Sequence, residues 1–504
     1  MELKNILAGL ENLKVKGDIN ISIDSVTSDS RKIKENGMFV CIEGFEVDGH
    51  NYIEDAINKG ASTIVFQEDK IDVIKKLNIP ENVTIVSAPD TRLALAIIGC
   101  NFYKNPSRKF KLIGITGTKG KTTTTFMIKK ILEKQGKKVG LIGTIAIYIG
   151  DKKIEDSDRT TPESIRLQEI FSKMVEEKVD VVVMEVSSQS LKLNRVAGCD
   201  FDIGVFTNFS QDHISAKEHV DMQDYFNSKL KLFDMCKIGY VNADDLYGVK
   251  VKKLAKCEIE TYGIDNFANL LAKDITITNS YVDFKAKLGD RNERVKTCIP
   301  GRFSVYNSLA AICVTKKLGV GAEEIKEGLV EVRVPGRSEL VDNKKDLTIM
   351  IDYAHSPESL ENILSAVKEY TRGRVISVFG CGGDRDTSKR PLMGAISGRI
   401  ADYTIITSDN PRTEKPEEIT KEIEEGMKKT KGKYEVIVDR REAIKQAISK
   451  ANKKDIVVLA GKGHETYQEI NGHKNDFDER IIVREIIDEM LEEENIQNLN
   501  KKKK

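Results

Sequence analysis

The chain has 504 residues, more than one hydrophobic core usually supports, so about three domains of ~150 residues each are expected. Hydrophobic residues make up 40% of it, which argues against global disorder. Lys plus Arg number 80 against 79 Asp plus Glu, and this formal net charge of +1 argues against a dedicated nucleic-acid or polybasic membrane binder.

The spacing of the cysteines and the composition of the amino-terminal residues indicate the cellular compartment. The eight cysteines lie far apart and form no CxxC pair, so zinc-ribbon and thioredoxin-like sites lack support. Residues 1–17 show no signal-peptide core, and no run approaches the ~18–20 apolar residues that a membrane span needs. We therefore expect a reduced, soluble, cytoplasmic protein without membrane insertion.

Short β-branched runs alternate with helical periods from about Lys111 onward. The runs end at or next to Gly, Asn, Asp or Ser, which is typical of strands buried on both faces of a parallel sheet. They cover 111–117, 179–186, 202–208, 347–353, 374–380, 403–409 and 455–461. The pattern predicts an α/β fold in which ligands gather at the carboxyl ends of strands.

Two turn signals predict the domain boundaries. One is KNPSRK at 104–109, and the other is VRVPGRSE at 332–339. The predicted domains are therefore 1–105, 106–335 and 336–504.

The segment TGTKGKTT (116–123) lies between a predicted strand and a predicted helix. Glycines let backbone N–H groups approach phosphate, the helix start adds positive potential, Lys121 can reach phosphoryl oxygens, and Thr122 can bind Mg²⁺. The spacing departs from GxxxxGK[ST], because isoleucine stands five residues before Gly120. The segment still predicts a nucleotide-phosphate loop, formed by Gly117, Thr118, Lys119, Gly120, Lys121, Thr122 and Thr123.

Polar residues follow two further predicted strands. Glu185 ends VVVME, and Asp212 and His213 follow FTNFSQ. Each alone would more often be a turn residue, but their repetition on neighbouring strands favours a metal site. Lys229 lies in the amphipathic segment YFNSKLKLF, where the residues alone predict a solvated face.

The ordered motifs resemble the Mur ligases, and within them the MurE branch of peptidoglycan assembly. The resemblance runs from about Asp29 to about Arg480. It is carried by TGTKGKTTT, RTTPES, MEVSSQSL, TNFSQDH, YFNSKLKLF, PGRFSVYNSLAA, VPGRSE, DYAHSPESL, GCGGDRDTSKRP, DNPR and AGKGHETYQ. It implies three domains: an amino-terminal one for a uridine nucleotide, a central P-loop-type parallel sheet for ATP, and a carboxyl-terminal Rossmann-like domain for an amino acid.

The resemblance also implies a reaction in cell-wall synthesis, and hence in cell shape and division. An ATP-dependent acid–amino acid ligase would convert the terminal carboxylate of UDP-N-acetylmuramoyl-L-alanyl-D-glutamate to an acyl phosphate. The amine of meso-2,6-diaminopimelate would then displace phosphate. The closest alternative is L-lysine addition; a folylpolyglutamate synthetase-like ligase and a P-loop switch or transport ATPase are more distant. A monomer that binds no nucleic acid is expected.

Catalytic roles follow from the resemblance for Lys121, Glu185, His213 and Lys229. Thr122 and Glu185 match the ligands of one Mg²⁺, and His213 helps to hold a second. Lys229 matches a lysine that CO₂ carbamylates, which turns a cation into an anionic metal ligand. Positions that contact the adenine, phosphates and ribose of ATP match Asn307, Arg337 and Asp352.

Substrate contacts are implied in the same way. Ser30 matches a uridine-side contact, and the muramoyl-peptide contacts match Thr160, Thr161, Ser187 and Arg195, although Ser30 and the threonines by themselves suit caps or turns. DNPR (Asp409, Asn410, Pro411 and Arg412) is the form associated with diaminopimelate, whose second carboxylate a guanidinium can bind in a bidentate manner. Arg390 would hold another carboxylate, and Gly461 and Glu465 the distal ammonium.

Overall fold

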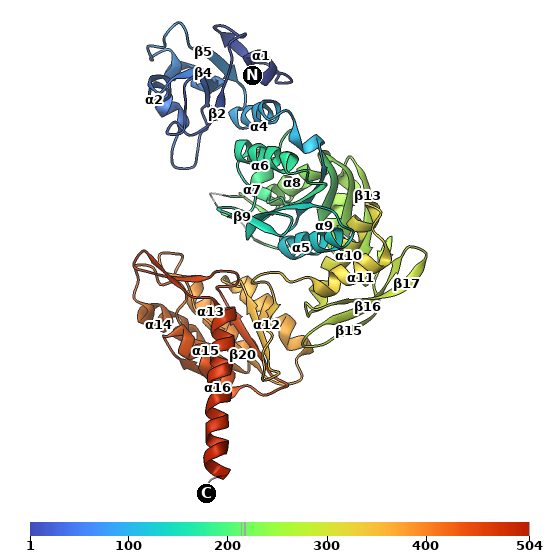
Figure 1. Ribbon diagram of the computed structural model, residues 1–504. Helices are drawn as coiled ribbons and strands as arrows, with labels where there is room; N and C mark the ends of the chain where they lie inside the picture. The colour runs from blue at the N-terminus through green and yellow to red at the C-terminus, as the bar shows by residue number, and fades with distance from the viewer. Residues whose placement is uncertain (213, 216–217, 503–504) are drawn as a thin grey trace. The chain divides into compact units, whose positions relative to one another are not determined.

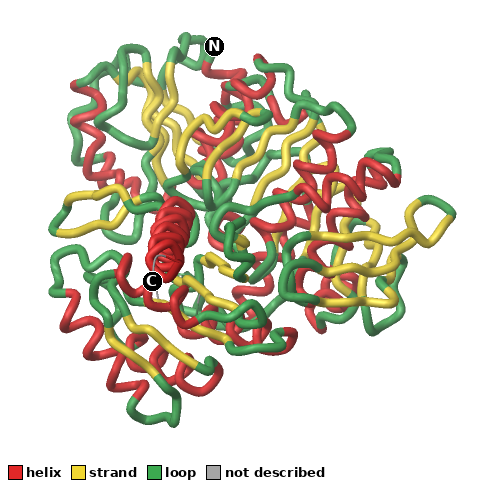
Figure 2. Tube along the Cα trace, turned by 60° about the horizontal axis from the view of Figure 1, so that its bottom comes forward, coloured by secondary structure: helices red, strands yellow, loops and turns green. Residues whose placement is uncertain are grey.

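The computed structural model describes residues 1–212, 214–215 and 218–502, with side chains described up to residue 496. The chain, coloured by residue number in Figure 1, groups into two compact units. Unit 1 is Met1–Leu271 with Leu309–Gly328, and unit 2 is Ala272–Ser308 with Leu329–Lys504. Both units combine sheets with helices, as the strands in yellow and helices in red of Figure 2 show. The α/β fold class is thereby confirmed, whereas the bounds of the three predicted domains stay a prediction.

The first part of unit 1 is a sheet in the order β1-β5-β4-β3-β2, parallel from β2 to β5 with β1 antiparallel. Buried side chains cover both faces, with Val65 on one face and Phe66 on the other. The elements are α1 (Leu3–Ile6), β1 (Lys14–Lys16), β2 (Ser25–Thr27), β3 (Gly37–Val40), η1 (Gly49–Tyr52), α2 (Ile53–Asn58), β4 (Ala61–Gln67), η2 (Glu68–Lys70), α3 (Ile71–Ile74), β5 (Thr84–Ala88), α4 (Thr91–Phe102) and η3 (Pro106–Arg108).

The second part of unit 1 is a sheet in the order β14-β13-β12-β11-β6-β10-β7-β8-β9. It is parallel from β14 to β7 and antiparallel at β8 and β9. Its strands are β6 (Lys111–Thr116), β7 (Val139–Ile142), β8 (Ala146–Ile149), β9 (Lys152–Asp156), β10 (Val181–Glu185), β11 (Phe201–Phe206), β12 (Cys236–Asn242), β13 (Glu258–Gly263) and β14 (Leu270–Leu271). Its helices are α5 (Lys121–Lys134), α6 (Ser164–Glu176), α7 (Ser188–Lys192), α8 (Met222–Leu230), η4 (Lys231–Asp234) and α9 (Leu246–Leu254). Helix α11 (Ala322–Glu331) begins in unit 1 and ends in unit 2.

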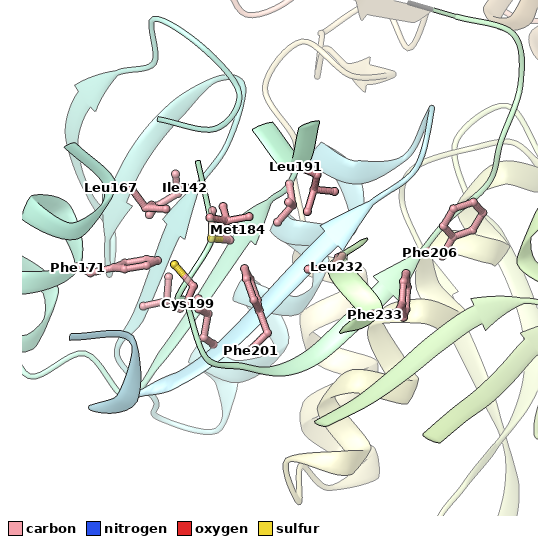
Figure 3. Close-up of a cluster of buried hydrophobic side chains, with 14 of the residues drawn as sticks. Ile142, Leu167, Phe171, Met184, Leu191, Cys199, Phe201, Phe206, Leu232 and Phe233 are labelled. Carbon is pink, nitrogen blue, oxygen red and sulfur yellow. The ribbon is translucent and has the colours of Figure 1, made fainter. Parts of the chain in front are cut away.

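A large apolar core holds this sheet against α6 and α8. The predicted β-branched strands supply much of it, because strands buried on both faces need apolar side chains at successive positions. Figure 3 shows part of this cluster, in which Ile142, Leu167, Phe171, Met184, Leu191, Cys199, Phe201, Phe206, Leu232 and Phe233 are labelled. Burying each such large side chain contributes about 1.5–3 kcal/mol, so the ends of β6, β10 and β11 are held on a rigid base.

Unit 2 is built on a sheet in the order β18-β19-β23-β20-β21-β22, parallel except for β18. Its strands are β18 (Glu339–Leu340), β19 (Thr348–Asp352), β20 (Val375–Phe379), β21 (Tyr403–Ile406), β22 (Tyr434–Val436) and β23 (Ile456–Ala460). Helices α12 (Pro357–Tyr370), α13 (Lys389–Ile400) and α14 (Pro416–Met427) pack on one face, and α15 (Arg440–Lys450) and α16 (Glu479–Lys502) on the other. Helices on both faces of a parallel sheet make it doubly wound, as in a Rossmann-like fold.

Two antiparallel additions in unit 2 were not predicted from the sequence. One is the sheet β15-β16-β17 (Lys273–Ile277, Val282–Leu288, Arg291–Thr297), and the other is the hairpin of β24 (Tyr467–Ile470) and β25 (His473–Asp476). Helix α10 (Arg302–Lys317) runs from unit 2 into unit 1.

The eight cysteines, all within the described residues, are free thiols. Among the described residues, no helix is both long and apolar enough to span a bilayer.

Candidate active site

The predicted phosphate loop connects β6 to α5. Gly117 has φ +142° and Gly120, at the amino-terminal cap of α5, has φ +84°, backbone conformations that glycine adopts without strain. A Cβ at Gly117 would overlap Thr207 Oγ1. The Lys121 ammonium donates to the carbonyls of Gly117 and Thr118, at 3.0 Å each, so the lysine lies over its own loop. The start of α5 thus combines N–H groups, a cation and close backbone approach, which suits phosphate.

Glu185, at the end of β10, lies beside this loop. Its side chain is buried, and Oε2 accepts hydrogen bonds from Thr122 Oγ1 and Thr144 Oγ1, at 3.1 Å each. Oε1 accepts one from the Thr144 amide at 2.9 Å. A carboxylate and a hydroxyl next to a phosphate loop are the oxygen donors that Mg²⁺ prefers, so these residues fit the ion. Among the described residues, no group of three His, Cys, Asp or Glu side chains gathers for a metal, and His213 lies outside those residues.

Lys229 occupies a different place from the one its residue pattern predicts. The side chain on α8 is 1% exposed, not solvated, and its ammonium donates to the Gly117 carbonyl at 2.9 Å. It lies 4.4 Å from the centre of the Tyr225 ring. Burial first, and then the charge of Lys121, hold the pKa of Lys229 well below its ordinary value. The solvated-face interpretation is therefore wrong: α8 turns this lysine onto the phosphate loop.

Unit 1 has a cavity of ≈ 230 Å³ next to Lys229. The structure brings predicted residues from several motifs to its lining, namely Lys121, Thr160, Ser187, Arg195 and Lys229. Thr161, the neighbour of Thr160, is not part of this lining, and its hydroxyl donates to the Glu185 carbonyl at 2.9 Å. Ser30, in the amino-terminal sheet region, is buried and does not line this cavity.

Sequence reasoning missed other residues of this lining: Arg159, Ser188, Gln189, Glu218 and His219. His219 is buried, with Nε2 2.9 Å from Ser188 Oγ and Nδ1 3.3 Å from Asp224 Oδ2. Arg159 and Ser188 stand inside the quoted motifs RTTPES and MEVSSQSL, so the signal was present. His219 had no such signal, because it lies in none of the quoted motifs and its Ser188 partner is 31 positions away.

Unit 2 contains the three residues that are expected to contact ATP, and one of them, Asp352, is the last residue of β19. Asp352 accepts a hydrogen bond from the Ser338 amide at 2.8 Å, and burial raises the pKa of its carboxyl although the charge of Arg337 lowers it. The Arg337 guanidinium lies over the Tyr353 ring, 4.8 Å from its centre. Asn307 is buried on α10. Arg337 and Asp352 thus lie close together, and their roles toward ATP stay predictions.

The segment Asp409–Arg412 follows β21, and the hairpin β24–β25 holds it through several hydrogen bonds. Gln468 Nε2 donates to the Asp409 carbonyl at 2.7 Å, and the Arg412 amide donates to the Glu469 carbonyl at 3.0 Å. Arg412 has φ +51°, and its side-chain Nη1 donates to the Gly383 carbonyl at 2.6 Å. Its Nε lies 3.3 Å from Glu469 Oε2. The guanidinium is therefore held by two of its three nitrogens.

The end of β23 supplies the second recognition segment. Gly461, with φ +115°, donates its amide to the Asp352 carbonyl at 3.0 Å and passes close to the Asp409 carboxylate. Glu465 Oε2 accepts from Asn410 Nδ2 at 2.8 Å. Arg440 is buried and donates to the carbonyls that precede both segments, those of Ser408 and Ala460. Asn410, Arg412, Gly461 and Glu465 are thus brought to one edge of the sheet.

Arg390 differs from its predicted setting. Its guanidinium on α13 is 1% exposed and forms ion pairs with Glu414 at 2.9 Å and Glu422 at 3.1 Å. The chain's own carboxylates therefore occupy this arginine, and contact with a substrate carboxylate stays a prediction. The proline of DNPR, Pro411, shapes the turn, since its carbonyl accepts from the Glu414 amide at 3.0 Å.

A phosphate loop beside a buried carboxylate, with a doubly wound second unit, defines a nucleotide-binding protein of the P-loop type. Three family descriptions match the chain: "Mur ligase family, catalytic domain" at residues 22–103, "Mur ligase middle domain" at 115–315 and "Mur ligase, glutamate ligase domain" at 336–463. The chain belongs to the Mur ligase family, whose members form amide bonds with ATP and Mg²⁺.

Similar proteins cover almost the whole chain. A protein of Caldanaerobacter subterraneus named UDP-N-acetylmuramoyl-L-alanyl-D-glutamate--2,6-diaminopimelate ligase is 50% identical over 490 residues, 97% of this chain and 99% of that protein. One of Clostridium acetobutylicum, with the same name and the number 1, is 48% identical over 97% of this chain and all of its own. A solved structure of a ligase of that name has 28% identity and a TM-score of 0.71, covering 97% and 99% of the two chains.

A solved structure with lower identity supports the fold alone. MurF ligase from Thermotoga maritima in complex with ADP is 18% identical, with a TM-score of 0.57 over 93% of this chain and 98% of that one. The predicted family resemblance and the α/β architecture are thus confirmed by independent comparisons.

Proposed function

We propose that the protein adds meso-2,6-diaminopimelate to UDP-N-acetylmuramoyl-L-alanyl-D-glutamate, with ATP hydrolysed to ADP and phosphate. The observation that carries the choice of amino acid is the edge formed by Asn410, Arg412 and Glu465, where a guanidinium, an amide and a carboxylate lie together. Diaminopimelate carries both an ammonium and a carboxylate at its distal end, whereas lysine carries only the ammonium. In a lysine ligase the half-buried Arg412 guanidinium, which already pairs with Glu469, would meet no substrate carboxylate, so that reaction would make no use of it.

Activation of the carboxylate is proposed to take place at the phosphate loop. Lys121 and the start of α5 bind the phosphates, and Thr122 with Glu185 would hold Mg²⁺, which draws charge from the phosphoryl oxygens. The cavity lined by Thr160, Ser187 and Arg195 would take the muramoyl-peptide end, because its hydroxyls and guanidinium suit a carboxylate-bearing peptide. The acyl phosphate formed there would be attacked by the amine of the amino acid.

Carbamylation of Lys229 is the second part of the proposal. A carbamate forms when a neutral amine attacks CO₂, so a lysine must first lose its proton. Burial of Lys229 and the positive charge of the nearby Lys121 lower the pKa of Lys229 and so favour the neutral amine. The resulting carbamate would carry negative charge beside Lys121 and offer oxygens to a metal.

Product mass tests the proposal directly. The protein is incubated with ATP, Mg²⁺, the dipeptide nucleotide and equimolar lysine and diaminopimelate. The expected product carries diaminopimelate, and a lysine product would refute the amino-acid choice. Folate ligation instead, or ATP turnover that needs no acceptor, would favour a folylpolyglutamate synthetase-like ligase or a P-loop switch or transport ATPase.

A further inference from the structure

Lys462 lies within the recognition edge of unit 2 but is itself completely buried, with 0% of its side chain exposed. It follows Gly461 at the end of β23. Its ammonium donates to Asn410 Oδ1 at 3.0 Å and lies 3.3 Å from Glu465 Oε2. The rings of Tyr467 and Phe477 stand 5.8 and 5.9 Å away. A buried cation in this setting needs partners, and it takes both of them from the residues proposed to bind the amino acid.

The contact with Lys462 determines which way the Asn410 amide points. Asn410 Oδ1 accepts from the Lys462 ammonium and from the Glu469 amide at 2.9 Å. Both partners are donors only, so the side-chain oxygen must face them and the NH₂ group must face the other way. One N–H of that group donates to Glu465 Oε2. The second N–H is left for an oxygen acceptor.

Glu465 is oriented in the same manner. Lys462 and Asn410 both bind its Oε2, and among the described residues Oε1 has no hydrogen-bond partner. The cluster therefore combines a donor at Asn410 and an acceptor at Glu465. This pairing matches a carboxylate and an ammonium on one carbon, which is the distal end of diaminopimelate.

We propose that Lys462 is a positioning residue that sets the polarity of Asn410 and the direction of Glu465, so that the pair binds the distal amino-acid end of the substrate. The inference rests on the proposed function and deepens it. Lys462 touches no substrate, because its side chain is fully enclosed. Without the cation, the Asn410 amide can turn its oxygen outward toward the substrate carboxylate, and Glu465 loses the charge that balances it.

Steady-state kinetics of Lys462→Met test this role. Methionine has a similar length but no charge, so KM for the amino acid should rise at least about ten-fold, the loss expected for one hydrogen bond to a charged group. The kcat at saturating amino acid and KM for ATP should change little, and Lys462→Arg should restore part of KM. The matched control is Lys474→Met, an exposed lysine whose ammonium lies 4.1 Å from the centre of the same Tyr467 ring, which should leave all constants unchanged.

If the role of Lys462 is purely structural, its replacement should change kcat and not KM. Partial unfolding of Lys462→Met would lower kcat through the active fraction and leave KM unchanged, which overturns the proposal. If Lys462→Met does not fold, Glu465→Gln is compared with the double variant Glu465→Gln/Lys462→Met, which contains no uncompensated carboxylate. A further rise in KM supports the role at Asn410, and equal KM values overturn it.

The diaminopimelate assignment and the positioning role of Lys462 can be refuted independently of each other. Each measurement uses the amino acid that the unaltered protein incorporates. A wild-type enzyme that adds lysine would refute the diaminopimelate assignment, while the KM comparison would still decide whether Lys462 positions the binding groups.

Discussion

Thr122 Oγ1 donates a hydrogen bond to Glu185 Oε2 over 3.1 Å, and this contact joins the start of α5 to the end of β10. The two residues lie 63 positions apart in the chain. They come together because β6 and β10 are parallel neighbours, so that the loops after both strands leave the sheet at the same edge. A carboxylate is thereby held next to the phosphate loop.

Glu185→Gln should lower kcat by about 100-fold or more, because the neutral amide no longer offers the charge that a magnesium ion needs at the transferring phosphate. The side chain keeps its size and can still accept the hydrogen bond of the Thr144 amide, so the melting temperature should change little. Phosphate release in a coupled assay measures the effect. Glu176→Gln, an exposed position on α6, is the control. Full activity in Glu185→Gln would falsify the metal-ligand role.

Gly117→Ala should abolish ATP binding and destabilise the protein, because the new Cβ would overlap Thr207 Oγ1 and force a residue with φ +142° away from its backbone conformation. Gly136→Ala is the matched control, since Gly136 also has positive φ, +79°, but nothing within 4 Å of the added carbon. The control should lose only about 1–2 kcal/mol from backbone strain. Calorimetric titration with ATP and chemical denaturation give the two readouts; equal behaviour of both variants would contradict the close-packing argument.

Lys229→Ala should reduce kcat by about 100-fold or more, since it removes the group proposed to become an anionic carbamate. Small carboxylates such as formate should restore part of the activity, and removal of bicarbonate should lower the activity of the unaltered protein. Labelled ¹³CO₂ should give a carbamate signal that Lys229→Ala lacks. Lys231→Ala, an exposed lysine two positions later, serves as control. A missing signal together with failed rescue argues against the carbamate.

Arg412→Ala should weaken use of diaminopimelate by about 2–5 kcal/mol, the range for truncating one partner of a buried charged pair. KM for ATP should stay the same, because the hydrogen bond and ion pair of the Arg412 side chain go to the Gly383 carbonyl and Glu469, neither of which is expected to contact ATP. Competition between lysine and diaminopimelate measures the change in preference. Arg399→Ala, exposed on α13, is the control. An unchanged preference for diaminopimelate over lysine would show that another group binds the second carboxylate of diaminopimelate.

Much of the fold could be predicted from local pattern. The strands predicted at 111–117, 179–186 and 202–208 form as β6, β10 and β11, because β-branched runs between turn residues have few alternatives to a buried strand. The antiparallel hairpin β24–β25 was missed. Its residues are half-buried or exposed, so they lack the apolar run that marks the parallel strands.

The amino-acid sequence by itself determined the strand-and-helix order, the phosphate loop and the family resemblance, since each depends on residues close together in the chain. Only the tertiary structure decided where single side chains lie. Lys229 reads as a solvated helix residue, yet its ammonium meets the Gly117 carbonyl, 112 positions away. Lys462 is likewise placed by contacts with Asn410, 52 positions earlier. Burial and pairing of charges depend on which segments the sheet brings together, and no local pattern contains that information.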